Sequence, residues 1–195
     1  FPLVTMAGEI FVTGERPTKL QIISGFLVML GLYIGFFYGK SSFLTGISPI
    51  GIAWGTLSVF AIAGQTLITR KISKTGDSDP IIQLFYAHVF AGIFLISAKS
   101  ALTGWSDLQF LTPRIFAIIH YPAIAASILG FGFLFTSLKY IPASLTSMIL
   151  TLEIAVALTL TPILLHQIPT PHEIAGCAVI LASVLCSILS RRKSL

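Results

Sequence analysis

Residues 14–21 read Gly14-Glu15-Arg16-Pro17-Thr18-Lys19-Leu20-Gln21 and stand before an apolar segment that contains Gly25. A similar corner recurs at residues 166–173, His166-Gln167-Ile168-Pro169-Thr170-Pro171-His172-Glu173, before an apolar segment that contains Gly176. Each copy combines a helix end, a proline turn and a Thr-x-x-Gln or Thr-x-x-Glu capping box that opens the next helix. Pro17 and Thr18 lie 152 positions before Pro169 and Thr170. The recurrence between long apolar segments predicts a duplicated membrane unit.

The composition indicates that lipid is the solvent for most of the chain. Of its 195 residues, 55% are hydrophobic and only 10% are charged, whereas soluble proteins use about 25% charged residues. So little polar surface cannot cover a soluble globule. The net charge of +5 does not indicate a nucleic-acid partner, because the basic residues stand singly or in small clusters at the ends of apolar segments. No spacing typical of a metal site or a bound cofactor is present.

Six apolar segments are long enough to cross about 30 Å of hydrocarbon as helices. They lie at about residues 20–38, 49–69, 81–98, 115–138, 143–165 and 173–190. Residues 1–13 have the pattern of the second half of another span, and the chain begins at Phe1 without an initiator Met. We therefore expect an N-terminally truncated fragment. Loops at 70–80 and 99–114 separate spans, and Trp105 in the second is expected to anchor at the membrane interface.

The basic residues predict the orientation in the membrane. Alternate loops share a side, so nine basic residues fall on one side and three on the other. The first group is Arg16, Lys19, Arg70, Lys71, Lys74, Lys139, Arg191, Arg192 and Lys193; the second is Lys40, Lys99 and Arg114. This bias places the C-terminus in the cytoplasm. Because five complete spans separate the corners at Thr18 and Thr170, the second copy is inverted relative to the first.

Glu153 is the sharpest candidate for a functional side chain. It is the eleventh residue of the segment 143–165, near the bilayer centre, where an ionised carboxylate costs about 2.5–3.5 kcal/mol or more. Two interpretations stay open: a cavity carboxylate that contacts a cationic substrate or carries a coupling proton, or a structural glutamate that joins two helices. Glu9 lies four or five residues from the cytoplasmic boundary, and its side chain is expected to extend toward water.

Further side chains, on the segment that contains Glu153 and on the segment 49–69, are weaker candidates for substrate binding. Ser144, Ser147 and Thr151 follow i, i+3, i+7 spacing, so they share one helix face and either line a cavity or serve helix packing. Trp54 is a candidate both for the aromatic belt and for a cavity wall. Gln65, deeper in the same span, either donates into a cavity or links two helices.

Two histidines with neighbouring tyrosines are further candidates. His88, close to Tyr86, lies within a span, where a histidine either shuttles protons near neutral pH or bonds across a helix interface. His120 and Tyr121 directly precede Pro122, which is expected to kink the helix and free a carbonyl group. Both pairs are therefore compatible with a cavity wall and with ordinary packing.

Gly31, Gly35 and Gly39 make two successive Gly-x-x-x-Gly steps in the segment 20–38. Such a face permits close approach of helices, either within the bundle or between the protomers of a homodimer. We expect these glycines to serve packing and to carry no chemistry.

Several of these stretches resemble EamA-type proteins of the drug/metabolite transporter superfamily. The corner at 14–18 resembles the end of the family's first repeat, and the stretch 53–71 resembles the opening span of its second. Tyr140-Ile141-Pro142-Ala143-Ser144, Leu152-Glu153-Ile154 and His166-Gln167 resemble the last helical pair. Where the family often has proline after the glutamate this chain has Ile154, and where it often has glutamate in the second corner this chain has Gln167.

The resemblance implies an all-α polytopic bundle of ten spans, made of two inverted five-helix repeats around a central cavity. Residues 1–40 would then be the end of the first repeat, with part of span four and all of span five. Residues 46–190 would be the second repeat, and 191–195 a basic cytoplasmic tail. The implied function is transport of a small organic solute or metabolite by alternating access in the plasma (inner) membrane, without a cofactor.

An enzyme is not expected, because the sequence has no nucleophile elbow, no paired carboxylates within one span and no phosphate-binding glycine loop. The main alternative is a membrane scaffold that has the transporter fold without transport. It predicts that Glu153→Gln leaves function intact, whereas disruption of the Gly31, Gly35 and Gly39 face abolishes it. A lipid-modifying enzyme would need a His, Asp and Ser cluster at one interface, and the sequence shows none.

Overall fold

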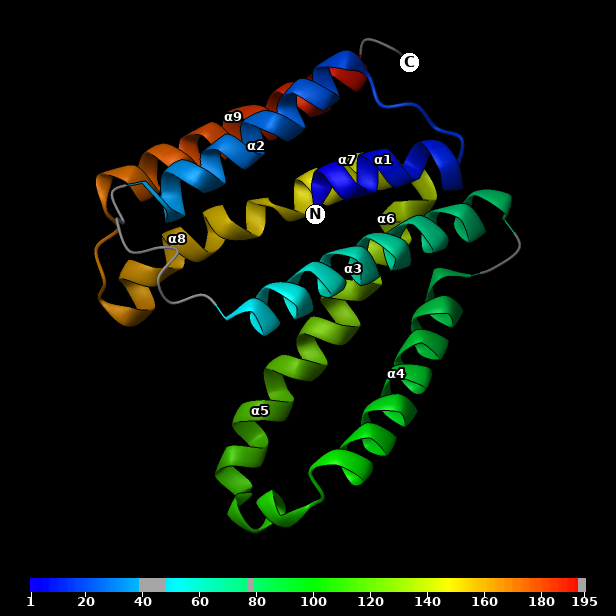
Figure 1. Ribbon diagram of the computed structural model, residues 1–195, viewed down its shortest axis with the longest axis vertical. Helices are drawn as coiled ribbons and strands as arrows, with labels where there is room; N and C mark the ends of the chain where they lie inside the picture. The colour runs from blue at the N-terminus through cyan, green and yellow to red at the C-terminus, as the bar shows by residue number, and fades with distance from the viewer. Residues whose placement is uncertain (39–47, 77–78, 193–195) are drawn as a thin grey trace. The chain divides into compact units, whose positions relative to one another are not determined.

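The computed structural model describes residues 1–38, 48–76 and 79–192, and the regular structure within these ranges is helical throughout (Figure 1). Six spans are long and apolar enough to cross a membrane, as the sequence predicts: Lys19–Phe36, Pro49–Thr75, Pro80–Leu102, Pro113–Tyr140, Ala143–Leu165 and Pro171–Ser190. A shorter apolar helix, α1 (Pro2–Val12), precedes them. The predicted all-α polytopic class is confirmed.

Four of these spans are single helices and two are interrupted. The single helices are α2 (Lys19–Phe36), α3 (Pro49–Thr75), α4 (Pro80–Leu102) and α9 (Pro171–Arg192). The span 113–140 consists of α5 (Pro113–Ala125), a π-helical turn η2 (Ala126–Gly130) and α6 (Phe131–Tyr140). The span 143–165 consists of α7 (Ala143–Leu150) and α8 (Leu152–Leu165). A 3₁₀ helix, η1 (Ser106–Phe110), lies between α4 and α5.

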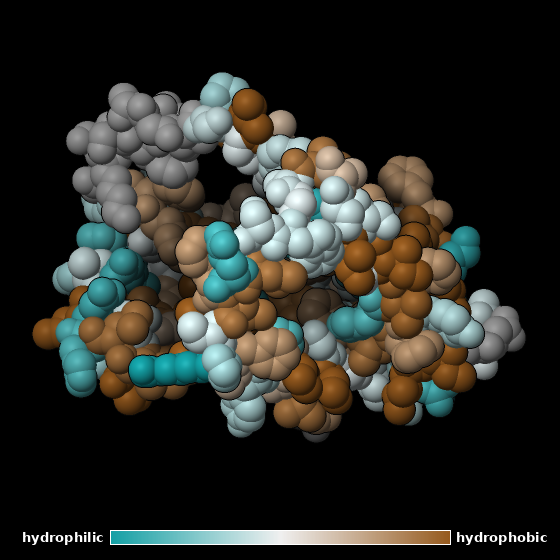
Figure 2. Space-filling view, turned by 90° about the horizontal axis from the view of Figure 1, so that it is seen from below, coloured by the Kyte–Doolittle hydropathy of each residue, from teal (hydrophilic) through white to brown (hydrophobic). Residues whose placement is uncertain are grey.

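The helices form two compact units. One contains residues Phe1–Ile68 and Ile141–Leu195, and the other contains Thr69–Tyr140. The first unit has a core of five buried apolar side chains, from α1, α2, α7 and α9: Met6, Val28, Met148, Ile180 and Val184. Apolar side chains also cover much of the surface shown in Figure 2. Soluble proteins rarely expose such surface, so this pattern fits a chain that lies in lipid.

The capping box predicted at the first corner is complete in the structure, and one of the two bonds of the second box is present. The Thr18 N–H donates to Gln21 Oε1 (2.8 Å), and the Gln21 N–H donates to Thr18 Oγ1 (3.2 Å). At the second corner the Thr170 N–H donates to Glu173 Oε2 (2.7 Å). In both α2 and α9, the side chain of the third helical residue therefore accepts a hydrogen bond from the backbone N–H of the threonine that precedes the helix.

The corners also share a left-handed residue that the sequence comparison did not identify. Gly14 has φ +71° and His166 has φ +54°, and the two positions are again 152 apart. Glycine adopts this conformation readily, whereas it is uncommon for histidine. The two corners therefore share this backbone conformation, although one has glycine and the other has histidine at the equivalent position.

Helices α2 and α9, which follow the two corners, pack side by side in an antiparallel pair (Figure 1). At one end Thr18 Oγ1 lies 3.1 Å from Ser190 Oγ. Toward the other end, a methyl group on Gly176 would lie 2.5 Å from the Gly31 carbonyl oxygen and 2.7 Å from the Gly35 nitrogen. The three glycines therefore allow backbone to meet backbone, and the two corners lie at opposite ends of the pair.

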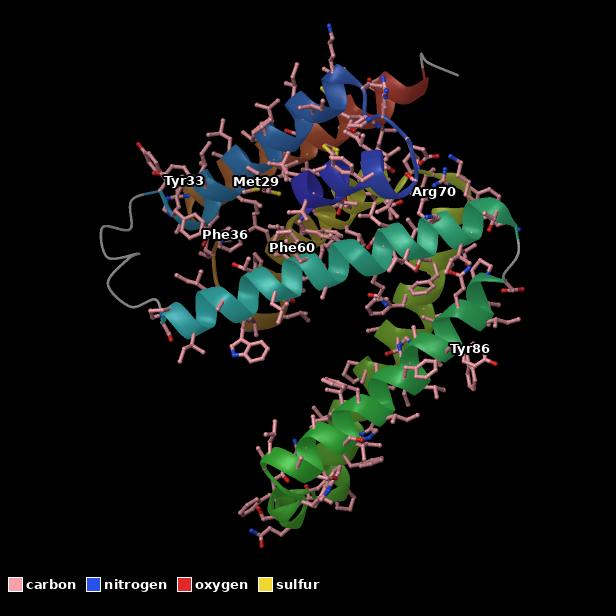
Figure 3. The ribbon with its side chains drawn as sticks, turned by 45° about the vertical axis from the view of Figure 1, so that its right-hand side comes forward. Met29, Tyr33, Phe36, Phe60, Arg70 and Tyr86 are labelled. Carbon is pink, nitrogen blue, oxygen red and sulfur yellow. The ribbon has the colours of Figure 1, made fainter. Side chains whose placement is uncertain are left out.

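Helix α3 runs farther than the sequence predicts. The loop was expected to start at residue 70, but the helix continues to Thr75 and is followed by Gly76 at φ +78°. Arginine and lysine favour helix and can extend their charges to water, so the loss of hydropathy does not end the helix. Arg70, labelled in Figure 3, also donates from Nη1 to the carbonyl oxygens of Leu138 (2.8 Å) and Lys139 (3.1 Å) near the end of α6.

Candidate functional site

The span 143–165 is broken at Thr151, two residues before Glu153. The Thr151 N–H donates to the Met148 carbonyl (3.1 Å), and the Ile154 N–H donates to the Thr151 carbonyl (3.2 Å). These bonds connect residues three apart, as in a 3₁₀ turn, where an uninterrupted α-helix connects residues four apart. The sequence predicts a membrane span over 143–165, which the structure confirms, and the structure shows the break within it.

Two hydroxyl groups bond to the preceding turn beside the break. Thr151 Oγ1 donates to the Met148 carbonyl (2.6 Å), and Ser147 Oγ donates to the Ser144 carbonyl (2.7 Å). Such bonds to the preceding turn compete with the helical ladder and bend helices. EamA-type proteins, which the sequence resembles, often have proline after the glutamate. This chain has Ile154 there, yet an interruption is still present. It lies before Glu153 instead of after it.

Glu153 occupies the first turn of α8. Its neighbours Leu152 and Ile154 pack against the apolar core, whereas the Glu153 side chain is exposed. Within the described ranges no residue donates a hydrogen bond to its carboxylate. A helix N-terminus inside a span favours negative charge, and interrupted helices of this kind form binding sites in transporters.

The two hydroxyl residues predicted beside Glu153 differ in exposure. Ser147 is fully buried, and Thr151 is half-buried at the break itself. On the adjacent helix α9, Ser187 Oγ donates to Met148 Sδ (3.2 Å). The polar stripe on α7 is therefore packed inside the first unit, and Thr151 is its member closest to Glu153 in sequence.

Trp54 and Gln65 lie on α3, and both side chains are exposed. No described residue joins either of them to Glu153. The structure thus leaves these two as separate candidates on one helix.

His88 and Tyr86 belong to the second unit. His88 Nδ1 donates to the Leu84 carbonyl (2.9 Å), which leaves Nε2 as the ring atom available for proton exchange. The imidazole packs edge-on against Phe131 of α6, with 5.9 Å between ring centres. Tyr86 stacks on Phe90 and points outward from α4 (Figure 3). The two side chains therefore have different environments, although they are close in sequence.

His120 and Tyr121 lie on α5 and both are exposed. The His120 ring stacks on Phe116, and its Nδ1 donates to the carbonyl of that residue (2.9 Å). Pro122 follows and removes one backbone donor from the helix. Helix α5 continues through Pro122 to Ala125, so the kink expected at Pro122 stays a prediction. A π-helical turn follows at Ala126–Gly130, a form often found at functional sites.

Glu9 is placed differently from the prediction. Its side chain is only 1% exposed, and its Oε1 accepts a hydrogen bond from the Ser144 N–H (3.2 Å). It does not extend to water but reaches from α1 to the first turn of α7, where Pro142 provides no side-chain cap. The sequence could not indicate this contact, because the two residues are 135 positions apart.

Of the predicted glycine face, Gly31 and Gly35 lie against Gly176 of α9, whereas Gly39 falls outside the described residues. The part of the face that can be seen is therefore covered within the chain. A homodimer would need a different surface from Gly31 and Gly35. Elsewhere in the described ranges, no group of three His, Cys, Asp or Glu residues is placed to hold a metal ion.

The sequence model of the EamA-like transporter family matches residues 49–189, which are 141 of the 195 residues. The matched range contains the break at Thr151 and Glu153. Searches of curated proteins and of solved structures found no match.

Proposed function

Because this chain belongs to the EamA-like transporter family, we propose that it carries a small organic solute or metabolite by alternating access, without chemical change. Its six apolar spans and its family make it an integral membrane protein of the transporter class. The observation that carries the proposed mechanism is the interrupted span, which places an exposed carboxylate, Glu153, next to a helix N-terminus.

Glu153 is proposed as the main contact for the cargo. A carboxylate in the middle of a span is costly in lipid, so it persists where it meets water, a partner or a proton. The N-terminal dipole of α8 lowers that cost. We assign it contact with a cationic group of the solute or with a coupling proton. The other predicted residues are proposed as supporting contacts: Trp54, Gln65, Tyr86, His88, His120, Tyr121, Ser147 and Thr151.

We propose that the protein lies in the plasma (inner) membrane and that its C-terminus is in the cytoplasm. The nine-to-three division of basic residues supports it. The antiparallel packing of α2 and α9, with Thr18 beside Ser190, supports an inverted duplication in which residues 1–40 end one repeat and 46–190 form the other. Thr18 then faces the cytoplasm and Thr170 the outside.

Uptake into proteoliposomes tests the function. The full-length protein is purified and assayed with a panel of organic cations, amines and neutral metabolites, with and without a proton gradient. We expect saturable uptake of at least one member, loss of most of it in Glu153→Gln, and partial retention in Glu153→Asp. Thr159→Val is the matched control, because its exposed hydroxyl bonds only within α8, to the Ala155 carbonyl (2.8 Å).

Two results would overturn the proposal. Absence of flux for every panel member under every gradient would argue against a carrier. Uptake that is unchanged in Glu153→Gln would remove Glu153 from the cargo site. If the cellular function also survived Glu153→Gln but failed when Gly31 was enlarged, the scaffold alternative would be favoured.

A further inference from the structure

We propose that α7 is a cytoplasmic gate helix, hinged at Thr151 and held closed by the hydrogen bond from the Ser144 N–H to Glu9. This inference rests on the proposed transport function and gives Glu9 a role as a positioning residue. Glu9 does not contact the cargo in this scheme. It fixes the helix that separates Glu153 from the cytoplasm.

The contact between α1 and α7 has the features of a latch. Glu9 and Ser144 are each 1% exposed, and their bond is 3.2 Å long. Pro142 gives α7 no side-chain cap, so the carboxylate from α1 supplies the acceptor that the helix start lacks. This bond joins a carboxylate to a backbone amide, so breaking it separates no pair of opposite charges.

The surface that would separate on opening can take water. Of the six buried residues of α7, four are small or carry a hydroxyl group: Ala143, Ser144, Thr146 and Ser147. On the facing helix α1, Thr5 is fully buried as well. Because hydroxyl groups can exchange protein partners for water, parting these helices costs less than parting two apolar surfaces. A permeation pathway needs such a lining.

The hinge is the turn around Thr151, where backbone hydrogen bonds connect residues three apart. Short 3₁₀ stretches within a helix often mark hinges, and α7 has only eight residues before the break. It can therefore rotate as one short element while α8 keeps its place, which is the usual form of a gating motion.

The latch lies on the proposed cytoplasmic side. Glu9 is in the last turn of α1, shortly before the Thr18 corner, and Ser144 is in the first turn of α7, shortly after Lys139. Glu153 lies beyond the hinge. Release of Ser144 from Glu9 would thus open a route from the cytoplasm toward Glu153, while α8 and its corner at Thr170 stay in place.

Cysteine labelling tests the gate without requiring transport. In the full chain with Cys177 and Cys186 replaced by alanine, Ser147→Cys places a thiol at a position with 0% exposure, one turn from Ser144. A membrane-impermeant maleimide is applied to the cytoplasmic face of inside-out vesicles. We expect slow labelling with Glu9 present and labelling at least several-fold faster in Glu9→Ala. Glu9→Gln should fall between them, because its amide oxygen still accepts a hydrogen bond.

Thr5→Val is the matched control, since Thr5 is equally buried on α1 but bonds within its own helix, to the Phe1 carbonyl (3.2 Å). It should leave the thiol protected. Unchanged labelling in Glu9→Ala, or equally fast labelling in Thr5→Val, would overturn the latch. If Glu9→Ala does not fold, Glu9→Gln tests the latch instead: labelling faster than with Glu9 present supports it, and unchanged labelling overturns it. Faster labelling in Glu9→Ala without any uptake would support the gate and count against the carrier function. Uptake that depends on Glu153, together with unchanged labelling in Glu9→Ala, would support the carrier function and overturn the gate.

Discussion

The two halves of the span 143–165 belong to one apolar run but are built differently. In α7, residues 143–148 are all buried, whereas none of the 14 residues of α8 is buried. α7 packs against α1 and contributes Met148 to the core, and its hydroxyl groups bond to the preceding turn. α8 contacts α9 but leaves Val156 and Ile163 exposed.

This difference shows that a continuous apolar run does not have to form one uniform helix. The run is apolar from end to end, yet the break at Thr151 separates a half held by packing from a half that faces outward. Glu153 stands at the start of the outward-facing half, where its charge is not enclosed by the core. Packing is therefore the role of α7, whereas α8 presents its side chains outward, and substitutions in the two halves should differ accordingly.

The largest expected effect is on the stability of α7. Met148→Ala removes a fully buried core side chain, so we expect it to lower the free energy of unfolding by about 2–5 kcal/mol. Ile163→Ala in α8 removes an exposed side chain and should cost less than about 1 kcal/mol. Unfolding titrations of both variants in the same detergent measure the two values. Equal losses would mean that the halves are not packed differently.

A second test concerns the α2–α9 pair against which α7 is placed. Gly176→Ala puts a methyl group 2.5 Å from the Gly31 carbonyl oxygen, so the helices must separate. We expect a loss of about 1–3 kcal/mol in the free energy of unfolding. Gly92→Ala, where no atom lies within 4 Å of the added methyl group, should be neutral or stabilising by up to about 1 kcal/mol. If Gly176→Ala were as stable as Gly92→Ala, the close approach of α2 and α9 would be refuted.

Much of the fold could be predicted because it depends on local properties. Apolar length defines the six spans, and the capping bonds from the Thr18 and Thr170 N–H groups follow from residue spacing alone. The end of α3 was predicted too early, because the criterion was hydropathy. Arg70 and Lys71 reduce hydropathy without opposing the helix, which continues to Thr75 before Gly76.

The site was predicted less completely, because its main features depend on distant or subtle interactions. Glu153 was identified from its charge in an apolar run. The break at Thr151 involves no proline or glycine, and the back-bonding of Thr151 and Ser147 has no sequence signature as strong as theirs. Glu9 was expected to extend to water, since its partner Ser144 becomes visible only when α1 and α7 are placed side by side.

A third test examines the break itself. Thr151→Val keeps the shape of the side chain but removes the hydroxyl group that bonds to the Met148 carbonyl. We expect α7 and α8 to become more nearly collinear and the free energy of unfolding to change by about 1 kcal/mol or less. Distances between spin labels on the two helices measure the angle. Thr159→Val, which removes a similar bond within regular α8, should leave those distances unchanged; a break that persists in Thr151→Val would have another cause.

The smallest effect is expected at an exposed carboxylate, which contrasts with the buried Glu9. Asp107 Oδ2, in η1, accepts a hydrogen bond from Lys99 Nζ (2.8 Å) in the last turn of α4, and this bond lowers the pKa of Asp107 below its ordinary value. Because the pKa is lower in the folded state, the pair stabilises the fold above the ordinary aspartate pKa of about 3.9. The contribution is lost as pH falls through the folded-state value.

We therefore expect a slight fall in melting temperature below about pH 4 that Asp107→Asn abolishes and that salt weakens. Melting curves at a series of pH values measure it, and a fall of equal size in Asp107→Asn would show that other carboxylates are responsible. Surface pairs of this kind contribute little, because solvent screens both charges. If loss of the Asp107 pair moved the melting temperature as much as Met148→Ala, the distinction between packed and exposed regions of this molecule would fail.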